Sequence, residues 1–266
     1  MAGIDKSGIK WLKNFGMDLI RSLGNEALTF YGKGKTSLKF DEELVTAAEL
    51  QLNATFRERL LEEFPEHQIF SNSQDNHGYT HDEKRYLWIF DPVDGVDNFQ
   101  TGIPIWGTSL ALLENFWPIF SVFFMPATGD LFHAGAGKEA YHNDKKMIVS
   151  THKGINDESL LLTYSRFHLD YHSRFPGKVR NLGCATAHIC YVAMGRADAA
   201  IIANESYQGL SAARVIIESA GAKIFNMDGS GFFLNEYLDG QKISDHLLVV
   251  APDNFSTVLS SFTKAA

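Results

Sequence analysis

The chain has 266 residues, enough to bury a substantial hydrophobic core in one large domain or in two closely packed lobes. Its 45% hydrophobic and 21% charged residues exclude a disordered chain. The formal net charge of −8 excludes a global basic field that would attract nucleic acid or anionic lipid, although a local basic patch is compatible with it.

The sequence carries no sign of export or membrane insertion. The N-terminal segment MAGIDKSGIKWLKNFGMDLI lacks a long apolar core followed by a small-residue cleavage site, so we predict no signal peptide. No apolar run reaches the ~18 residues that a membrane span needs. The two cysteines, Cys184 and Cys190, are expected to be core thiols rather than a disulfide or a metal pair. We therefore expect a cytoplasmic protein with no membrane partner.

The first half of the chain predicts two helices and then an antiparallel meander of strands. Apolar residues at helical spacing predict helices over residues 8–30 and 45–64, the second stopped by Pro65. The polar, glycine-punctuated segment 71–85 is expected to be a loop. Strand-like runs separated by Gly, Pro, Asn and Asp lie at residues 87–90, 108–114, 118–126, 130–137, 139–143 and 147–150.

The second half alternates between the two kinds of element. Strands are predicted at residues 160–165, 198–203 and 246–252. Helices are predicted at residues 183–195, 209–220 and 253–263. Because helices and strands come in layers rather than in regular βαβ units, the pattern indicates an α+β fold. We expect an N-terminal α+β lobe, residues 1–150, and a C-terminal α/β lobe, residues 151–266, packed as one globular unit.

The strongest chemical signal is the motif DPVDG at residues 91–95, directly after the apolar strand 87–90. Two carboxylates three residues apart, with the Val93 carbonyl between them, offer three oxygen ligands to a hard cation such as Mg²⁺. Gly95 permits a tight bend, and the amides after it would face a phosphate if a helix began near Val96. Taken alone, two Asp residues in a turn more often simply cap and solvate it.

The wider context of this motif resembles the inositol-monophosphatase family from about residue 8 to residue 262. DPVDGVDNF is similar to the family's DP-apolar-DGT-x-NF signature, and residues 103–150 follow its succession of a proline, a serine-bearing strand and hairpins. NLGCATAHICYVAMGRADAA resembles the family's Gly-Ser-Ala-Ala helix with its Val-Ala-x-Gly-Arg-x-Asp turn. ESAGAKI resembles its Glu-Ala-Gly-Gly-x-Val segment.

The resemblance implies a layered αβαβα sandwich and Mg²⁺-dependent hydrolysis of small phosphorylated polyols, such as inositol or sugar phosphates. It places the metal on Asp91, Asp94 and the Val93 carbonyl. It places the substrate against two short segments, Gly95, Val96 and Asp97, and Gly183, Cys184 and Ala185. The family commonly forms symmetric dimers, so the resemblance also implies a homodimer.

Four positions depart from the family pattern at the chemistry itself. Asn72 stands in place of a metal-binding Glu, Val96 in place of the Thr that orients water, and Gly209 in place of the Asp of the second metal. Ile202 stands in place of the Glu that binds the sugar diol. Because these changes remove charge and a hydroxyl group, the sequence predicts a single weak Mg²⁺ site or none.

Two functional classes therefore stay open. One is a weakened metal-dependent phosphomonoesterase, and the other is a non-catalytic pseudo-phosphatase that keeps the scaffold for ligand binding, assembly or regulation. Both would take a small phosphorylated polyol or another small anion, and an acidic chain is not expected to bind nucleic acid.

Several other polar residues have the chemistry to take part in this site. The acids that could rebuild a second metal site, although each alone is expected to be solvated, are Glu49, Asp75, Asp82, Glu83, Asp97 and Glu205. His188 is expected to be a satisfied core residue, and the pair His77 and His81 lies in the predicted loop rather than on a helix. The basic cluster of Lys33, Lys35 and Lys39 is expected to be a solvated loop.

Overall fold

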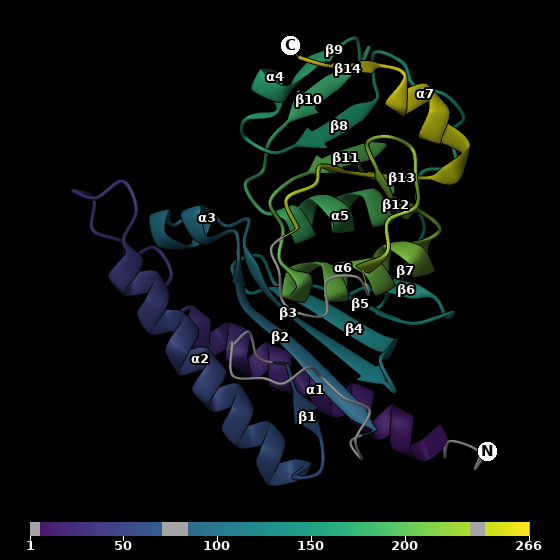
Figure 1. The fold of residues 1–266 in the computed structure, drawn as a ribbon. Coiled ribbons are helices and arrows are strands. Elements are labelled where there is room, and N and C mark those ends of the chain that lie inside the picture. Colours follow the sequence, from purple (N-terminus) through teal and green to yellow (C-terminus); the bar gives the residue numbers. More distant parts are fainter. Residues whose placement is uncertain (1–5, 71–84, 235–242, 266) are drawn as a thin grey trace.

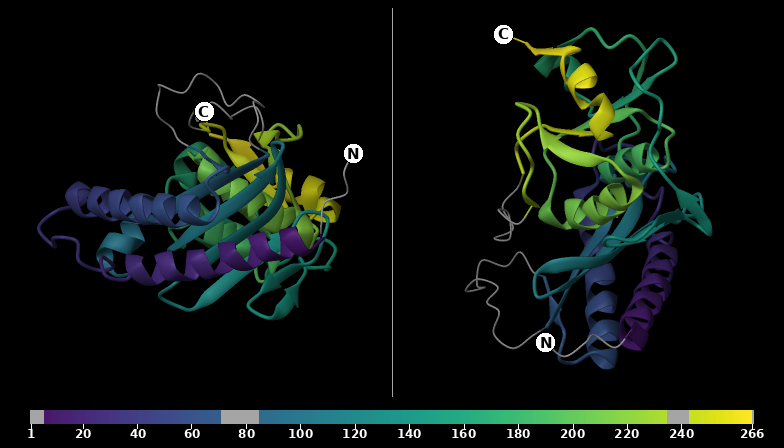
Figure 2. Two further views of the ribbon diagram at one scale, coloured as in Figure 1. Left: turned by 90° about the horizontal axis from the view of Figure 1, so that it is seen from below. Right: turned by 90° about the vertical axis from the view of Figure 1, so that its right-hand side faces the viewer.

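The computed structural model describes residues 6–70, 85–234 and 243–265 (Figure 1). Within these ranges the chain forms five layers, in the order helices, sheet, helices, sheet and a thin outer layer (Figures 1 and 2). The expected layered αβαβα sandwich is therefore confirmed.

Two long helices form the first layer, α1 (Lys6–Ala27) and α2 (Glu42–Glu63). They cover one face of the large sheet because α1 packs on strands β3 and β4, and α2 on β2. Asp41 caps α2, since its side chain accepts a hydrogen bond from the Leu44 backbone N–H at 3.2 Å.

The large sheet contains seven strands, ordered as they occur in the chain. They are β1 (Gln68–Ile69), β2 (Tyr86–Asp94), β3 (Gly107–Glu114), β4 (Trp117–Met125), β5 (Asp130–Gly135), β6 (Ala140–His142) and β7 (Lys145–Met147). Every neighbouring pair is antiparallel except β1 and β2, so the predicted meander is confirmed. All eight residues of β3 are buried, because helices cover both faces of the sheet.

Helices α5 (Ala185–Ala193) and α6 (Tyr207–Ala220) form the middle layer. They pack against each other and separate the two sheets, and their many small residues allow this close approach. The second sheet has the strand order β10 (Lys178–Arg180), β8 (Leu160–Thr163), β11 (Ala199–Ile202), β13 (Leu247–Val250) and β12 (Lys223–Asn226). Strand β12 was not predicted, because only the buried Ile224 marks it as part of a sheet.

The outer layer corrects the prediction of a helix over residues 253–263. A 3₁₀ turn, η2 (Pro252–Asn254), leads into α7 (Phe255–Leu259), and the chain then becomes strand β14 (Phe262–Lys264). The helix ends at Leu259, and in the turn that follows the Ser261 hydroxyl donates to the Val258 carbonyl at 2.6 Å. Strand β14 then pairs antiparallel with β9 (Tyr171–Ser173), which follows the short helix α4 (Phe167–Asp170). No helix within the described part of the chain is both long and apolar enough to cross a membrane.

Two glycines of α1 provide a matched test of how tightly this helix packs. A Cβ atom at Gly24 would lie 2.5 Å from the ring of Phe124 and 2.8 Å from Pro126, whereas a Cβ at Gly8 would meet nothing within 4 Å. We expect Gly24→Ala to lower the free energy of unfolding by about 1–3 kcal/mol through overpacking. Gly8→Ala should instead raise it by about 0.5–1 kcal/mol, because alanine favours the helix. Urea denaturation of both variants checks this, and equal effects would contradict the packing described.

Candidate active site

Strand β2 carries two carboxylates near its C-terminal end, Asp91 and Asp94. Asp91 pairs with Ser109 and Asp94 with Gly107 across β3, and the register shifts between these pairs at an irregularity in β2. Gly95 follows with φ of 87°, which brings the chain into the short helix α3 (Val96–Thr101). The predicted strand, turn and helix therefore form, and both Asp residues lie at the turn.

Asp91 lies in an environment that opposes its ionisation. Burial, the Asp94 carboxylate and the carboxylate of Glu49 on α2 together raise the pKa of Asp91 to about 7. Burial also raises the pKa of Glu49. The expectation that Glu49 is solvated is therefore wrong, because α2 carries it toward the carboxylates of β2. An ionised Asp91 is therefore unfavourable here unless a positive charge lies beside it.

Asp94 is held by the first turn of α5. Its Oδ2 accepts a hydrogen bond from the Thr186 backbone N–H at 2.7 Å, which ties β2 to the middle layer. Burial raises the pKa of the Cys184 thiol well above its usual value, and the adjacent Asp94 carboxylate adds to this. Both cysteines are buried and free, as predicted.

Gly209, which stands where the resemblance puts the Asp of a second metal, lies beside Asp91. A Cβ atom at Gly209 would stand 3.2 Å from Asp91 Oδ2 and 3.8 Å from Glu205 Oε2. The residue belongs to the first turn of α6, where Ser206 Oγ accepts a hydrogen bond from its backbone N–H at 3.0 Å. An acidic side chain at residue 209 would thus lie beside the turn that carries Asp91 and Asp94. Glu205 is partly exposed and reaches the same region, on the wall of a pocket.

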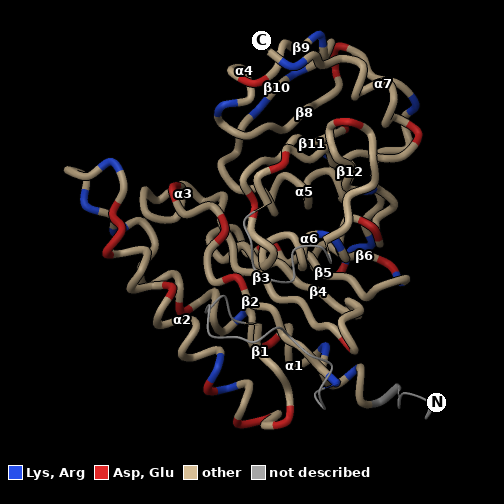
Figure 3. The backbone as a smooth tube through the Cα atoms, viewed as in Figure 1, with Lys and Arg blue, Asp and Glu red and all other residues tan. Residues whose placement is uncertain are grey.

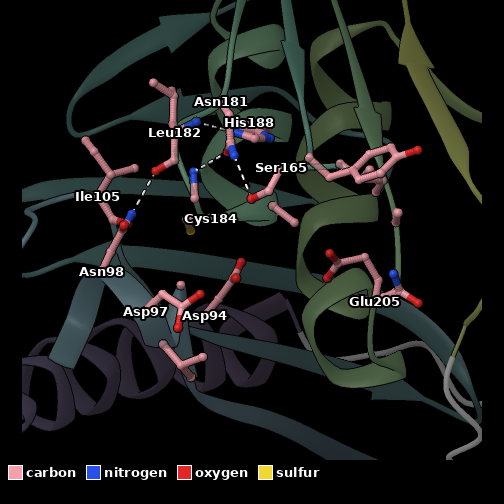
Figure 4. Close-up of a pocket in the computed structure, with 18 of the residues that line it drawn as sticks. Asp94, Asp97, Asn98, Ile105, Ser165, Asn181, Leu182, Cys184, His188 and Glu205 are labelled. Atoms are coloured by element: carbon pink, nitrogen blue, oxygen red, sulfur yellow. Dashed lines mark hydrogen bonds between the residues drawn. The ribbon is translucent and has the colours of Figure 1, made fainter. Parts of the chain in front are cut away.

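These elements enclose a pocket of about 670 Å³ (Figure 4). Asp94 and Asp97 lie together on one wall, and Glu205 lies across from them. All six residues predicted to contact substrate line the pocket, together with Ile202 at the diol position. They are Gly95, Val96, Asp97, Gly183, Cys184 and Ala185.

Two glycines allow the two substrate segments to approach each other. A Cβ at Gly95 would stand 3.0 Å from Cys184 Cβ, and one at Gly183 would stand 2.8 Å from the side-chain amide of Asn98. Both have positive φ, so larger residues would be strained there. The buried Asn98 amide donates to the carbonyls of Ile105 at 2.6 Å and Leu182 at 2.7 Å, which fixes α3 against the segment before α5.

Sequence reasoning missed Asn98 as a structural residue of this pocket, although it is the Asn of the quoted DPVDGVDNF motif. It also missed Ser165 and Asn181, which line the pocket and are joined by a hydrogen bond of 2.8 Å from the Asn181 amide (Figure 4). These two lie 16 residues apart near the ends of β8 and β10, and no local pattern marks such a pair.

Some predicted residues lie outside the described ranges or away from the carboxylates. Asn72, Asp75, Asp82 and Glu83 and the histidines 77 and 81 fall outside the described residues. The lysines at 33, 35 and 39 are exposed, as expected, and Lys35 pairs with Glu43 at 2.8 Å. No three His, Cys, Asp or Glu side chains in residues 6–70, 85–234 and 243–265 converge to hold a metal.

His188 is the satisfied core residue that the sequence predicts. Its Nε2 accepts a hydrogen bond from the Leu182 backbone N–H at 3.0 Å, so the ring is neutral there. Burial lowers the pKa of His188 to about 4.

The lowered pKa of His188 predicts that the folded protein loses stability in acid. The unfolded chain takes up the His188 proton near pH 6.5 whereas the folded chain does so only near pH 4, so stability is lost as the pH falls through this window, by up to ~3 kcal/mol. We expect His188→Gln, which keeps an acceptor but does not titrate, to lose less stability between pH 7 and 4.5. The exposed His168→Gln is the control, and urea denaturation at both pH values is the measurement. Equal acid sensitivity of all three proteins would contradict this role.

The fold and the carboxylate-bearing turn define a class of protein related to phosphatases. Residues 6–244 match the model of the Inositol monophosphatase family, and the chain belongs to that family.

Known proteins similar to this chain carry several different names. A putative Nus factor SuhB of Neisseria meningitidis serogroup B is 28% identical over 239 residues, covering 86% of this chain and 88% of that protein. A histidinol-phosphatase of Chlorobaculum parvum is 28% identical, covering 80% and 85% of the two chains. Among solved structures, an IMPase of Thermotoga maritima has a TM-score of 0.75 at 21% identity, with 93% and 95% of the chains covered.

Proposed function

We propose that this protein binds small phosphorylated polyols in the pocket beside Asp94, together with one Mg²⁺, and hydrolyses them slowly. Membership of the inositol-monophosphatase family supports a phosphorylated substrate. The similar proteins support this as well, since they include a histidinol-phosphatase and an inositol monophosphatase of yeast. Two solved structures of similar fold are complexes of SaIMPase-II, one with inositol monophosphate and one with 2′AMP. The observation that carries the low rate is Gly209, which stands beside Asp91 and offers no carboxylate there.

The residues of the turn fit one divalent cation. Asp91 and Asp94 would hold it, with the Val93 carbonyl as a third oxygen, and the raised pKa of Asp91 reflects a site that lacks compensating positive charge. When bound, Mg²⁺ would act as a Lewis acid on the phosphate and lower the pKa of a water molecule. A second cation would depend on Glu205 or Glu49, the two acids that the fold brings close.

The protein's own groups account for binding better than for turnover. The backbone at Gly95 and Val96 lies at the start of α3 on the pocket wall, where amides can face a phosphate. Val96 has no hydroxyl, so it cannot take part in orienting or deprotonating water. Ile202 offers no carboxylate to a sugar diol, so the polar groups of Ser165 and Asn181 are the candidates to contact the polyol.

A non-catalytic binding protein is the second candidate, and Val96 and Gly209 favour it. Calorimetry with inositol-1-phosphate, with Mg²⁺ or with EDTA, and a phosphate-release assay separate the two. We expect Mg²⁺-dependent binding, abolished by Asp94→Asn, and turnover at ~10⁻² s⁻¹ or slower, about a thousandfold below a typical enzyme. Binding with no measurable release would favour the non-catalytic protein. Turnover near 10 s⁻¹, lost in Asp91→Asn, would overturn the proposed low activity.

Three further expectations remain predictions. They are the homodimer, the cytoplasmic location and the division of the chain near residue 150. Light scattering of the purified protein would test the first.

A further inference from the structure

A second pocket, of about 570 Å³, lies between α1 and the hairpins β4–β5–β6. Its walls share no residue with the candidate active site. Three lysines line it, Lys10 and Lys13 from one face of α1 and Lys138 from the turn after β5. Figure 3 shows Lys and Arg residues gathered along the N-terminal half of α1, which stands out in a chain with a net charge of −8.

Among the described residues, no ion pair neutralises these lysines. In the part of the chain that the structure describes, none of the three ammonium groups forms a salt bridge. The one carboxylate on the pocket wall, Glu139, accepts hydrogen bonds from Lys146 Nζ at 2.5 Å and from the Tyr141 hydroxyl at 2.7 Å. Its charge is therefore already balanced by another lysine.

Lys13 is directed into the pocket by its surroundings. Its Nζ lies 5.9 Å from the centroid of the buried Phe120 ring, and its stem is partly buried. The same Nζ stands only 2.5 Å from the point where a Cβ of residue 135 would lie, so Gly135 provides the space for it. A partly desolvated ammonium of this kind gains more from an anionic partner than an exposed one does.

The electrostatics of neighbouring groups agree with an excess of positive charge. Burial and the charge of Lys138 lower the pKa of Lys13. The pKa of His133, also on the pocket wall, is lowered mainly by burial, which the hydrogen bond with the Asn143 carbonyl opposes; Arg21 and Lys13 lower it further, and Asp144 raises it. A bound anion would raise both pKa values.

The shape and lining of the pocket limit the kind of ligand. Phe120 and Met17 give it an apolar part, and the His133 ring stacks on Tyr141 with centroids 5.4 Å apart. A concave site with three lysines suits a compact, multiply charged anion better than an extended polymer, which would need a longer basic surface.

We propose that this pocket between α1 and β5 binds a small polyanion carrying two adjacent phosphate-type groups, contacted by Lys10, Lys13 and Lys138. Binding at this site does not depend on the candidate active site or on any hydrolytic activity.

Inorganic pyrophosphate is the probe, titrated by calorimetry into the full-length protein in EDTA. Without a cation, the acids at Asp91, Asp94 and Glu205 repel anions, so we expect no pyrophosphate to bind in the active-site pocket. We expect one pyrophosphate per chain, bound about tenfold or more weakly in Lys13→Met and in Lys138→Met. The matched control is Lys223→Met, an exposed lysine on β12 that also lacks an ion pair within the described residues. It should leave the affinity unchanged, and circular dichroism verifies that each variant folds.

Three results would overturn the proposal. They are the absence of pyrophosphate binding by wild type, equal weakening in all three lysine variants, and tighter binding by Asp94→Asn, which would place the ligand beside the carboxylates of the active site. Tight, steeply salt-dependent binding of a long polyphosphate without binding of pyrophosphate would also overturn it, in favour of an extended surface.

Discussion

Gly209→Asp combined with Val96→Thr is expected to raise Mg²⁺-dependent hydrolysis of inositol-1-phosphate by about 100-fold over wild type. The aspartate would place a carboxylate beside Asp91, and the threonine would restore a hydroxyl at the turn. Each change restores a part of the metal and water activation that contributes several kcal/mol to such reactions. Steady-state phosphate release at saturating Mg²⁺ is the measurement.

Close packing and charge repulsion at residue 209 are expected to lower the stability of the Gly209→Asp variant. A Cβ there stands 3.2 Å from Asp91 Oδ2, so Asp91 must shift by a few tenths of an ångström. Without a cation, the added carboxylate also repels Asp91, so the variant should be less stable than wild type in EDTA and should recover in Mg²⁺. Gly209→Asn with Val96→Thr is the matched control, since it has the same shape without the charge. If it gained as much activity as the Asp variant, the missing carboxylate would not be the cause of the low rate.

The sequence predicts well what depends on local pattern and chain order. The apolar run 87–90 ending in DPVDG predicts a strand and an acidic turn, which the structure has. The resemblance put Gly209 at the position of the family's second metal ligand, and the structure places it beside Asp91. The helix at residues 253–263 was predicted too long because the apolar Phe262 fits a helix as well as a strand. Its pairing with Ser173 on β9 is a long-range contact that periodicity does not report.

The environment of the site was harder to predict, because it also depends on contacts between distant parts of the chain. Glu49 and Glu205 read as ordinary polar residues of an exposed helix and a loop, and each reading is reasonable within its own segment. Their approach to the site depends on how α2 and α6 pack on β2, which is a property of the whole fold. The same holds for the pocket at Lys13, whose charges come from α1 and from the turn after β5.

Asp91→Asn is expected to stabilise the protein in EDTA while it abolishes stabilisation by Mg²⁺. The carboxyl of Asp91 has a pKa of about 7 in the folded chain and about 3.8 in the unfolded one. Its contribution to stability is full below pH 3.8 and is lost as the pH rises through 7, because the unfolded chain ionises first. Above pH 7 the ionised Asp91 lowers the free energy of unfolding by a constant amount, up to ~4 kcal/mol. The neutral asparagine does not lose this stability.

Thermal unfolding at pH 8 measures both effects. In EDTA the Asn variant should melt higher than wild type, by as much as ~10 °C if the full shift applies. Excess Mg²⁺ should raise the melting temperature of wild type but not of the variant, since the variant has lost a charged ligand. Asp97→Asn is the control, because it removes the same charge from an exposed position three residues beyond Asp94. A variant that melts lower than wild type in EDTA would mean that the Asp91 carboxylate is already compensated by the protein, and the turn would then have no need of a cation.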